Sequence, residues 1–278
     1  MDVLYLLDTS ALRALPGKLL EEGAFYASPY CVWELLTHLD EKDFARCKGR
    51  LLKARFTHVL DDPRAAVETP LLPHDTKLQK RVSDGELIGH ILAALNDSHS
   101  LERFYRSPIR DSNGELRQVA YSAANARNVL AEAERRYTEF IQQIVGAFRS
   151  GHVNLNDDKD HYGAILGLLE GDVIKLQRRG ATDDGLSDKL LSSYYFYCSY
   201  VFHRALAYFR SGKTKPESND FEDAEICRHL ALDTSYCLVT ADKGLKDTLE
   251  KSIALVERLD DPKLRTSVRV VDAGSLRE

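Results

Sequence analysis

Short apolar runs at the two ends of the chain predict four strands of a parallel sheet. Val3 to Leu7 is continuously apolar and ends at Asp8, the pattern of a strand buried on both faces. Tyr236 to Val239 has the same character near the other end, and Ala24 to Ala27 and Ser267 to Val271 are further candidates. Helical segments alternate with these runs, which is typical of an α/β fold.

Helical periodicity and capping residues predict the connections between these strands. Ser28 and Pro29 resemble an N-cap followed by proline at the first helical position. Apolar residues then recur at i, i+3, i+4 and i+7, which predicts an amphipathic helix. These residues are Val32, Leu35, Leu36 and Leu39. Further helices are expected from Ser10, over Asp220 to Leu232, and from the turn at Thr240 to Gly244 as far as Arg258.

The middle of the chain has a different pattern, with helical periods and hardly any strand-like alternation. The expected helices are Asp84 to Tyr105, Val119 to Phe148, His161 to Arg178 and Leu186 to Phe209. The expected loops, from their Gly, Pro, Ser, Asn and Asp content, are Pro108 to Leu116, Arg179 to Gly185 and Ser211 to Asn219. Ser193 to Phe209 is dense in aromatic residues and is expected to build a core, with base stacking or a partner surface as alternatives.

This arrangement predicts two domains, one of them discontinuous. Each outer part alone holds too few strands for a stable sheet, so the two ends are expected to meet and the middle block to be an insertion. The expected α/β domain comprises residues 1–55 and 217–278, and the expected helical insertion comprises residues 56–216. The predicted fold is thus a small parallel sheet flanked by helices and interrupted by a mostly α-helical insertion.

Composition narrows the function classes. The net charge of −5 argues against a protein that coats nucleic acid by bulk electrostatics. It does not exclude a nuclease, since an acidic enzyme can carry a local basic rim that binds the phosphate backbone. We expect a cytoplasmic protein without a membrane partner, because no apolar run approaches bilayer length and no basic signal region is present. The five scattered cysteines lack zinc-like spacing and are interpreted as buried reduced thiols. Phosphate-loop, dinucleotide, zinc-protease and esterase motifs are absent from the sequence.

Four acids are candidates for one site. Asp8 and Asp242 follow predicted strands, and ligands of open parallel sheets bind beyond the carboxyl ends of the strands. Glu34 lies early in the helix after the second strand, and Asp223 lies near the start of the helix before the Asp242 strand. All four are therefore expected to converge on one end of the sheet.

The segments around these acids resemble the four acidic motifs of the PIN-domain nucleases. They read L-L-D-T-S at Leu6 to Ser10, V-W-E-L-L at Val32 to Leu36, E-D-A-E-I at Glu222 to Ile226 and L-V-T-A-D-K-G-L at Leu238 to Leu245. The resemblance implies a PIN-like sheet, a Mg²⁺ or Mn²⁺ site and hydrolysis of RNA that leaves 5′-phosphate and 3′-hydroxyl ends. The long helical insertion departs from the compact family pattern.

Carboxylates suit this chemistry independently of the family. Hard cations prefer oxygen ligands and can activate water and neutralise charge at a phosphodiester. Each acid also has a structural interpretation. Asp8 could end a strand, Glu34 could be a solvated helix position, and Asp242 could cap the following helix. Asp220 could be an N-cap with Asp223 in the first turn.

Three further residues are auxiliary candidates. Ser10 and Thr240 match hydroxyl positions that in the family lie beside the acidic site, where they could orient a ligand or water. Each is equally compatible with a local cap. Asp220 is an additional acid close to Asp223.

The sequence thus predicts a metal-dependent endoribonuclease that uses Asp8, Glu34, Asp223 and Asp242, with RNA as its partner. DNA is the alternative substrate, since the acids do not distinguish the two sugars. A catalytically inactive PIN-like scaffold that binds RNA or a protein through the helical insertion is the alternative from another class. A second copy of the chain or a regulatory protein is a further candidate partner.

Overall fold

The computed structural model of the chain describes residues 4–75, 84–111, 114–182, 185–213, 215–217, 219–259 and 261–276. Its centre is a five-stranded sheet in the order β3-β2-β1-β6-β7, with every neighbouring pair parallel. The strands are β1 (Leu4–Leu7), β2 (Phe25–Ala27), β3 (His58–Val59), β6 (Tyr236–Thr240) and β7 (Arg269–Asp272). The expected α/β class, with a parallel sheet flanked by helices, is confirmed.

The two ends of the chain meet in the middle of this sheet. β1 pairs with β6 over four residues, from Leu4 opposite Tyr236 to Leu7 opposite Val239. From β1 the strand order proceeds outward to β2 and β3 on one side, and from β6 to β7 on the other. The boundary between β1 and β6 is therefore a topological switch point, where open α/β sheets bind their ligands.

Alternation along the central strands gives the sheet two buried faces. Leu6 and Leu238 point into one apolar core, and Leu7 and Val239 point into the other. All four side chains are fully buried. This explains the unbroken apolar character of these strands in the sequence, because neighbouring residues of a strand point to opposite faces.

Short helices connect the strands of the amino-terminal half. They are α1 (Thr9–Ala14), α2 (Gly17–Glu22), α3 (Pro29–Thr37), α4 (Phe44–Leu51) and the 3-10 turn η1 (Leu52–Phe56). α3 begins as predicted, since the Ser28 hydroxyl accepts a hydrogen bond from the Tyr30 amide and Pro29 is the first helical residue. Val32, Leu35 and Leu36 are buried against the second core. Hydrophobic periodicity and the N-cap residues were therefore sufficient to predict the start and the buried face of α3.

The carboxyl-terminal half supplies α12 (Asp220–Cys227), α13 (Lys243–Leu259), η2 (Pro262–Leu264) and η3 (Ala273–Leu276). α12 is shorter than the helix expected from Asp220 to Leu232. The Arg228 amide donates a hydrogen bond to the Glu225 carbonyl, and the His229 amide donates one to the Ile226 carbonyl. These bonds span three residues, so the helix ends in a tighter 3-10 turn. The chain then leaves the helix, and the Leu232 amide bonds the Ser192 carbonyl.

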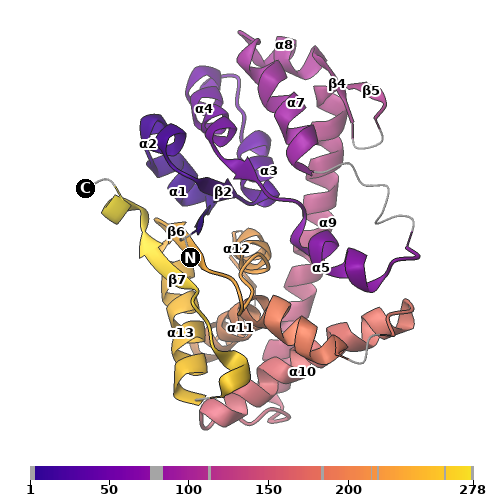
Figure 1. Cartoon of the computed structure of the whole chain (residues 1–278), viewed down its shortest axis with the longest axis vertical. Helices are drawn as coiled ribbons and strands as arrows, with labels where there is room; N and C mark the ends of the chain where they lie inside the picture. The colour runs from indigo at the N-terminus through magenta and orange to yellow at the C-terminus, as the bar shows by residue number, and fades with distance from the viewer. Residues whose placement is uncertain are drawn as a thin grey trace.

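Long helices dominate the middle of the chain. They are α9 (Val119–Arg149), α10 (Asp158–Arg178) and α11 (Leu186–Ser211), accompanied by the shorter α5 (Pro63–Leu71), α7 (Asp84–Asn96) and α8 (Leu101–Arg106). α9 runs along the molecule from the group around α7 and α8 to the group around α10 and α11 (Figure 1). The three long helices confirm the predicted periodicity.

Two sequence predictions for the middle region were wrong. The expected loop from Pro108 to Leu116 contains β4 (Pro108–Arg110), which pairs antiparallel with β5 (Leu116–Gln118). Its turn is closed by the Asp111 carboxylate, which accepts from the Glu115 amide at 3.0 Å, and by Gly114 at φ +78°. The expected helix from Asp84 to Tyr105 is interrupted between α7 and α8, because the Ser100 hydroxyl caps a new helix at the Arg103 amide.

The helical middle region and the sheet share their cores. One core joins Leu6 and Leu238 to apolar residues of α9, α10 and α11, and the other joins Leu7 and Val239 to α7 and α8. β3 also lies within residues 56–216, beyond the expected domain boundary at residue 55. The division into two domains stays a prediction, and its boundary excludes one strand of the sheet.

The aromatic segment of α11 is core, as expected. Tyr194, Tyr195, Phe196, Tyr200 and Phe202 are all at most 2% exposed. All five cysteines are free thiols; four are buried and Cys47 is half-buried. Within the part of the chain that the structure describes, no helix combines the length and apolar character needed to cross a bilayer.

Candidate functional site

The candidate site lies at the carboxyl edge of the sheet, where β1 and β6 end side by side. Leu7 is in register with Val239, so Asp8 and Thr240 follow at neighbouring positions. The Asp8 amide bonds the Val239 carbonyl at 3.2 Å, which continues the pairing one residue beyond β1. Asp8 therefore occupies the switch point of the sheet.

Hydroxyl and amide donors hold the Asp8 carboxylate. The Thr240 hydroxyl donates to Oδ2 at 2.6 Å, and the Ala11 amide donates to Oδ1 at 2.6 Å, so that Asp8 also caps α1. The Ser10 hydroxyl lies 2.9 Å from Oδ1 and 2.8 Å from Oδ2. Ser10 and Thr240 thus lie beside the acid, as expected, and together they fix its orientation.

The turn between β6 and α13 in turn orients both hydroxyls. The Ala241 amide donates to Ser10 Oγ at 2.7 Å, and the Asp242 amide donates to Thr240 Oγ1 at 2.8 Å. Each hydroxyl oxygen accepts from the backbone and can donate to Asp8. Residues more than 200 positions apart therefore form one hydrogen-bonded network.

Asp242 directly precedes α13, and both of its carboxylate oxygens accept hydrogen bonds. Its Oδ1 accepts from the Leu245 amide at 3.0 Å, which is the helix-cap role considered in the sequence. Its Oδ2 lies 3.5 Å from the Asn219 amide nitrogen. Asp242 is half-buried, so this acid lies between the buried network and solvent.

Asp223 lies in the first turn of α12 and is 8% exposed. The Tyr200 hydroxyl donates to its Oδ2 at 3.2 Å. Burial raises the pKa of Asp223 well above its usual range, and the negative charges of Asp8, Asp242 and Asp220 raise it further. The electrostatic coupling brings Asp223 into the same group as the two strand-end acids.

Burial also dominates the electrostatics of Asp8. It raises the pKa of the Asp8 carboxyl to about 6, against the hydrogen bonds from Thr240, Ala11 and Ser10, which lower it. The charge of Asp242 raises this pKa as well. The charges of Asp8, Asp223 and Asp242 thus oppose one another, an arrangement that a bound cation would stabilise.

Glu34 lies in α3 and has a different environment. Its carboxylate forms an ion pair with Arg13 at 3.0 Å, and its side chain is 18% exposed. Its charge raises the pKa values of both Cys31 and Glu222, whereas the acids whose charges act on Asp223 are Asp8, Asp242 and Asp220. The positive charge of Arg13 therefore balances Glu34, whereas the partners of Asp8 are neutral hydroxyl and amide donors.

Asp220 belongs to a network that holds α11 against α12. Arg204 donates to its Oδ1 at 2.6 Å, and the Tyr208 hydroxyl donates to its Oδ2. Burial raises the pKa of Asp220, and these two partners oppose the rise. Asn219, and not Asp220, is the N-cap of α12, so the proposed N-cap is displaced by one residue. The contacts of Asp220 account for its burial structurally.

Sequence reasoning missed Glu222, a further acid of α12 that is influenced by Glu34 and Asp220. Its Oε2 is buried without a hydrogen bond to a described residue. Burial raises its pKa to about 7, and the charges of Glu34, Glu134 and Asp220 contribute. Such a value suits a group that exchanges protons at neutral pH. Its place beside Asp223 in the E-D-A-E-I motif was the available signal.

Tyr200 and Asn219 were also missed. Tyr200 was assigned to the aromatic core, and it is buried there, but its hydroxyl reaches Asp223. A buried phenol needs a hydrogen-bond partner, and the sequence does not reveal which one. Asn219 lies in a segment expected to be a loop, and its amide approaches Asp242.

Oxygen donors dominate this group of acids, the ligand type that Mg²⁺ and Mn²⁺ prefer. Among the described residues, no set of three or more His, Cys, Asp or Glu side chains is arranged as it would be around a metal ion. Mg²⁺ commonly makes only one or two direct carboxylate contacts and retains water. Asp8 and Asp223 can supply that number.

Comparison with known proteins adds no family to this description. No family model matches the chain, and neither a curated protein nor a solved structure matches it.

Proposed function

We propose that the chain is a metal-dependent endoribonuclease, in which Asp8, Asp223 and Asp242 bind Mg²⁺ or Mn²⁺ at the carboxyl edge of the sheet and Glu34 borders this site. The resemblance of the four acidic segments to PIN-domain motifs supports this proposal. The observation that carries it is the unfavourable interaction of Asp223 with Asp8 and Asp242, the acids that follow β1 and β6 at the switch point; Asp8 and Asp223 are both buried.

Buried like charges are unfavourable unless a partner relieves them. The charge of Asp8 raises the cost of ionising Asp223, and the named partners of both acids are neutral hydroxyl or amide donors. A site of this kind commonly serves a function, since stability alone does not favour it. When bound, a divalent cation would neutralise charge on a phosphodiester and activate water.

The surrounding residues would position the acids. Thr240, Ser10 and the Ala11 amide restrict the rotation of the Asp8 carboxylate, and Tyr200 does the same for Asp223. Such supporting hydrogen bonds orient metal-binding carboxylates. Glu222, with a pKa of about 7, would accept or release a proton near neutral pH.

Two observations favour a second candidate, an inactive scaffold that binds RNA or a protein. Both oxygens of Asp8 already accept hydrogen bonds, and Arg13 already neutralises Glu34. A structural role would account for both contacts. The helical middle region would then provide the binding surface.

Cleavage of a mixed substrate panel tests the proposal. The panel contains single-stranded RNA, folded RNA and single-stranded DNA, each with Mg²⁺, Mn²⁺ or EDTA. We expect metal-dependent cleavage of RNA that falls by on the order of 100-fold in Asp8→Asn and in Asp242→Asn, because metal sites depend strongly on their ligands and supporting groups.

Asp233→Asn is the matched control. Asp233 is exposed and precedes β6, so the substitution removes one carboxylate at the opposite end of the same strand. It should leave cleavage unchanged. Cleavage of DNA alone would reassign the substrate. If no polymer is cut and neither metal raises the melting temperature, the scaffold is the better description.

A further inference from the structure

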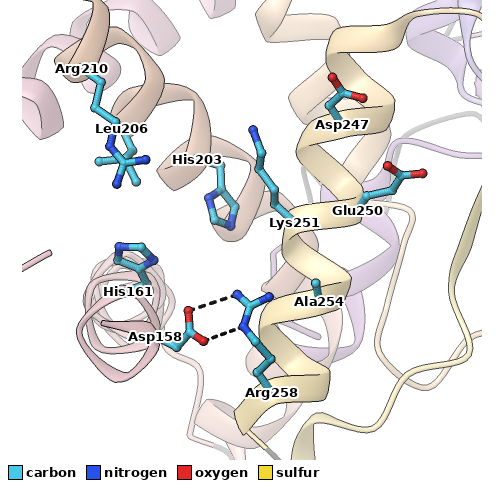
Figure 2. Close-up of a pocket in the computed structure, with 10 residues that line it drawn as sticks. All are labelled: Asp158, His161, His203, Leu206, Arg210, Asp247, Glu250, Lys251, Ala254 and Arg258. Carbon is cyan, nitrogen blue, oxygen red and sulfur yellow. Dashed lines mark hydrogen bonds and ion pairs between the residues drawn. The ribbon is translucent and has the colours of Figure 1, made fainter. Parts of the chain in front are cut away.

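A pocket of about 470 Å³ lies between α10, α11 and α13, apart from the acidic edge of the sheet. Figure 2 shows its lining, with His161 on α10, His203 and Arg210 on α11, and Lys251 on α13. None of the acids at the candidate nuclease site lines it. Its volume is within the range of small-molecule sites, roughly 300 to 1,000 Å³.

Two histidines in this pocket have unused polar atoms. The Nε2 atoms of His161 and His203 are buried, and neither makes a hydrogen bond to a described residue. Their rings are perpendicular, with centroids 6.5 Å apart. Buried polar atoms usually have partners, so two orphaned ring nitrogens in one pocket point to a ligand.

Cations surround the same space. The side chains of Arg210 and Lys251 are exposed, and neither forms a hydrogen bond or ion pair with a described residue. In Figure 2, Arg210 extends toward His161 and Lys251 runs beside His203, and the charges of both act on His203. Arg258 closes one end of the pocket, where it forms two bonds to the Asp158 carboxylate, at 2.5 and 3.0 Å.

The acids of the pocket leave this positive character largely in place. Asp158 is occupied by Arg258. Glu250 points away from the histidines in Figure 2 and lies 3.9 Å from Lys246, which leaves Asp247 at the rim. Burial lowers the pKa of His203 to about 4, and His161, Lys251, Arg258 and Arg210 lower it further. The field at His203 is therefore positive.

We propose that this pocket binds a small phosphomonoester through its phosphate group, with Arg210 and Lys251 as the charged donors and the two histidines beneath them. Guanidinium, ammonium and imidazole donors from three helices approach from different directions, which suits a tetrahedral dianion. The pocket exceeds the size of a phosphate group and leaves room for an attached organic part. This function is independent of the proposed nuclease activity.

Calorimetric titration of the whole chain without divalent metal tests the proposal. The probes are inorganic phosphate, ribose 5-phosphate and ribose. We expect ribose 5-phosphate to bind and ribose not to bind. Affinity should fall about 10-fold or more in Arg210→Met and in Lys251→Met, because each loses a charge-assisted hydrogen bond.

Lys263→Met is the matched control. Lys263 is exposed, pairs with Asp188 at 3.3 Å and lies outside the pocket lining. The substitution therefore removes the same positive charge from another part of the molecule. It should leave the affinity unchanged. If inorganic phosphate binds as tightly as ribose 5-phosphate, the phosphate alone is the ligand. The absence of binding by either phosphate probe, or equal loss in the control, overturns the proposal.

Nuclear magnetic resonance of the histidine side chains gives a second readout. A bound dianion favours the imidazolium form, so ribose 5-phosphate should raise the pKa of His203 from about 4. Ribose should not change it. Because neither experiment measures cleavage, failure of this proposal and failure of the nuclease proposal are distinguishable.

Discussion

At the scale of the residue, the ionised carboxylate of Asp8 lowers the stability of the folded protein. It lies at the end of the central strand, is 2% exposed and faces other acids. Its neighbours Thr240, Ser10 and Ala11 donate hydrogen bonds that favour the charged form, yet burial outweighs them. At the scale of the residue, desolvation is the larger effect.

The raised pKa of Asp8 predicts a pH dependence of stability. The unfolded carboxyl ionises near its usual pKa of 3.8, whereas the folded one ionises near 6. The folded state therefore binds more protons between these values, and stability falls as pH rises through this window. Two pKa units correspond to about 3 kcal/mol as an upper limit.

Asp8→Asn should remove this part of the pH dependence, because the asparagine side chain does not titrate. Urea unfolding of wild type and variant between pH 4 and 7 measures it. Asp233→Asn, an exposed carboxylate at the other end of β6, should keep the wild-type slope. Identical slopes in Asp8→Asn and wild type would contradict the assignment.

At the scale of the element, glycine stabilises the end of one helix and destabilises the interior of another. Gly212 ends α11 in a left-handed conformation, with φ +70°, and its amide bonds the Phe209 carbonyl at 3.3 Å. Gly171 lies inside α10, where an added Cβ would meet nothing within 4 Å. The first position requires glycine and the second does not.

Gly212→Ala should therefore destabilise the protein by about 1 kcal/mol, through the cost of a left-handed alanine. Gly171→Ala should stabilise it by about 0.5 to 1 kcal/mol, because alanine restricts the unfolded chain and favours the helix. Urea unfolding of the matched pair checks both signs. Stabilisation by Gly212→Ala would show that α11 does not end there in solution.

At the scale of the whole molecule, the sheet and the helical middle region pack as a shared structure. Leu6 and Leu238 of the sheet lie in one core with α9 to α11, and Leu7 and Val239 lie in the other core with α7 and α8. Separating the two parts would expose both cores. Shared burial of this kind favours cooperative unfolding.

Unfolding monitored by two probes tests this cooperativity. Trp33, the one tryptophan of the chain, lies in α3 next to the sheet and reports that region by fluorescence. Circular dichroism at 222 nm reports mainly the long helices. We expect the two urea transitions to coincide. Separate midpoints would instead support the two domains predicted from the sequence.

Local features were predictable because local forces determine them. The apolar runs of β1 and β6, the Ser28 cap of α3 and the periodicity of α9 depend on neighbours within a few residues. The β4 and β5 hairpin escaped prediction because its strands have three residues each and β5 is exposed throughout. So short a pattern carries too little periodicity.

The sequence by itself determined strands β1, β2, β6 and β7 of the parallel sheet, the main helices and the placement of Asp8 and Asp242 at strand ends, since side-chain periodicity and capping act over short distances. It did not reveal β3, because the two residues of that strand carry too little pattern. Only the tertiary structure decided that Thr240 bonds Asp8 and that Tyr200 bonds Asp223. It also decided that Arg13 accompanies Glu34. These contacts join segments that are remote in the chain, so they depend on how the segments pack and how deeply the side chains are buried. The strength of a charge interaction depends on the distance between the two charges in space and not on their separation in sequence.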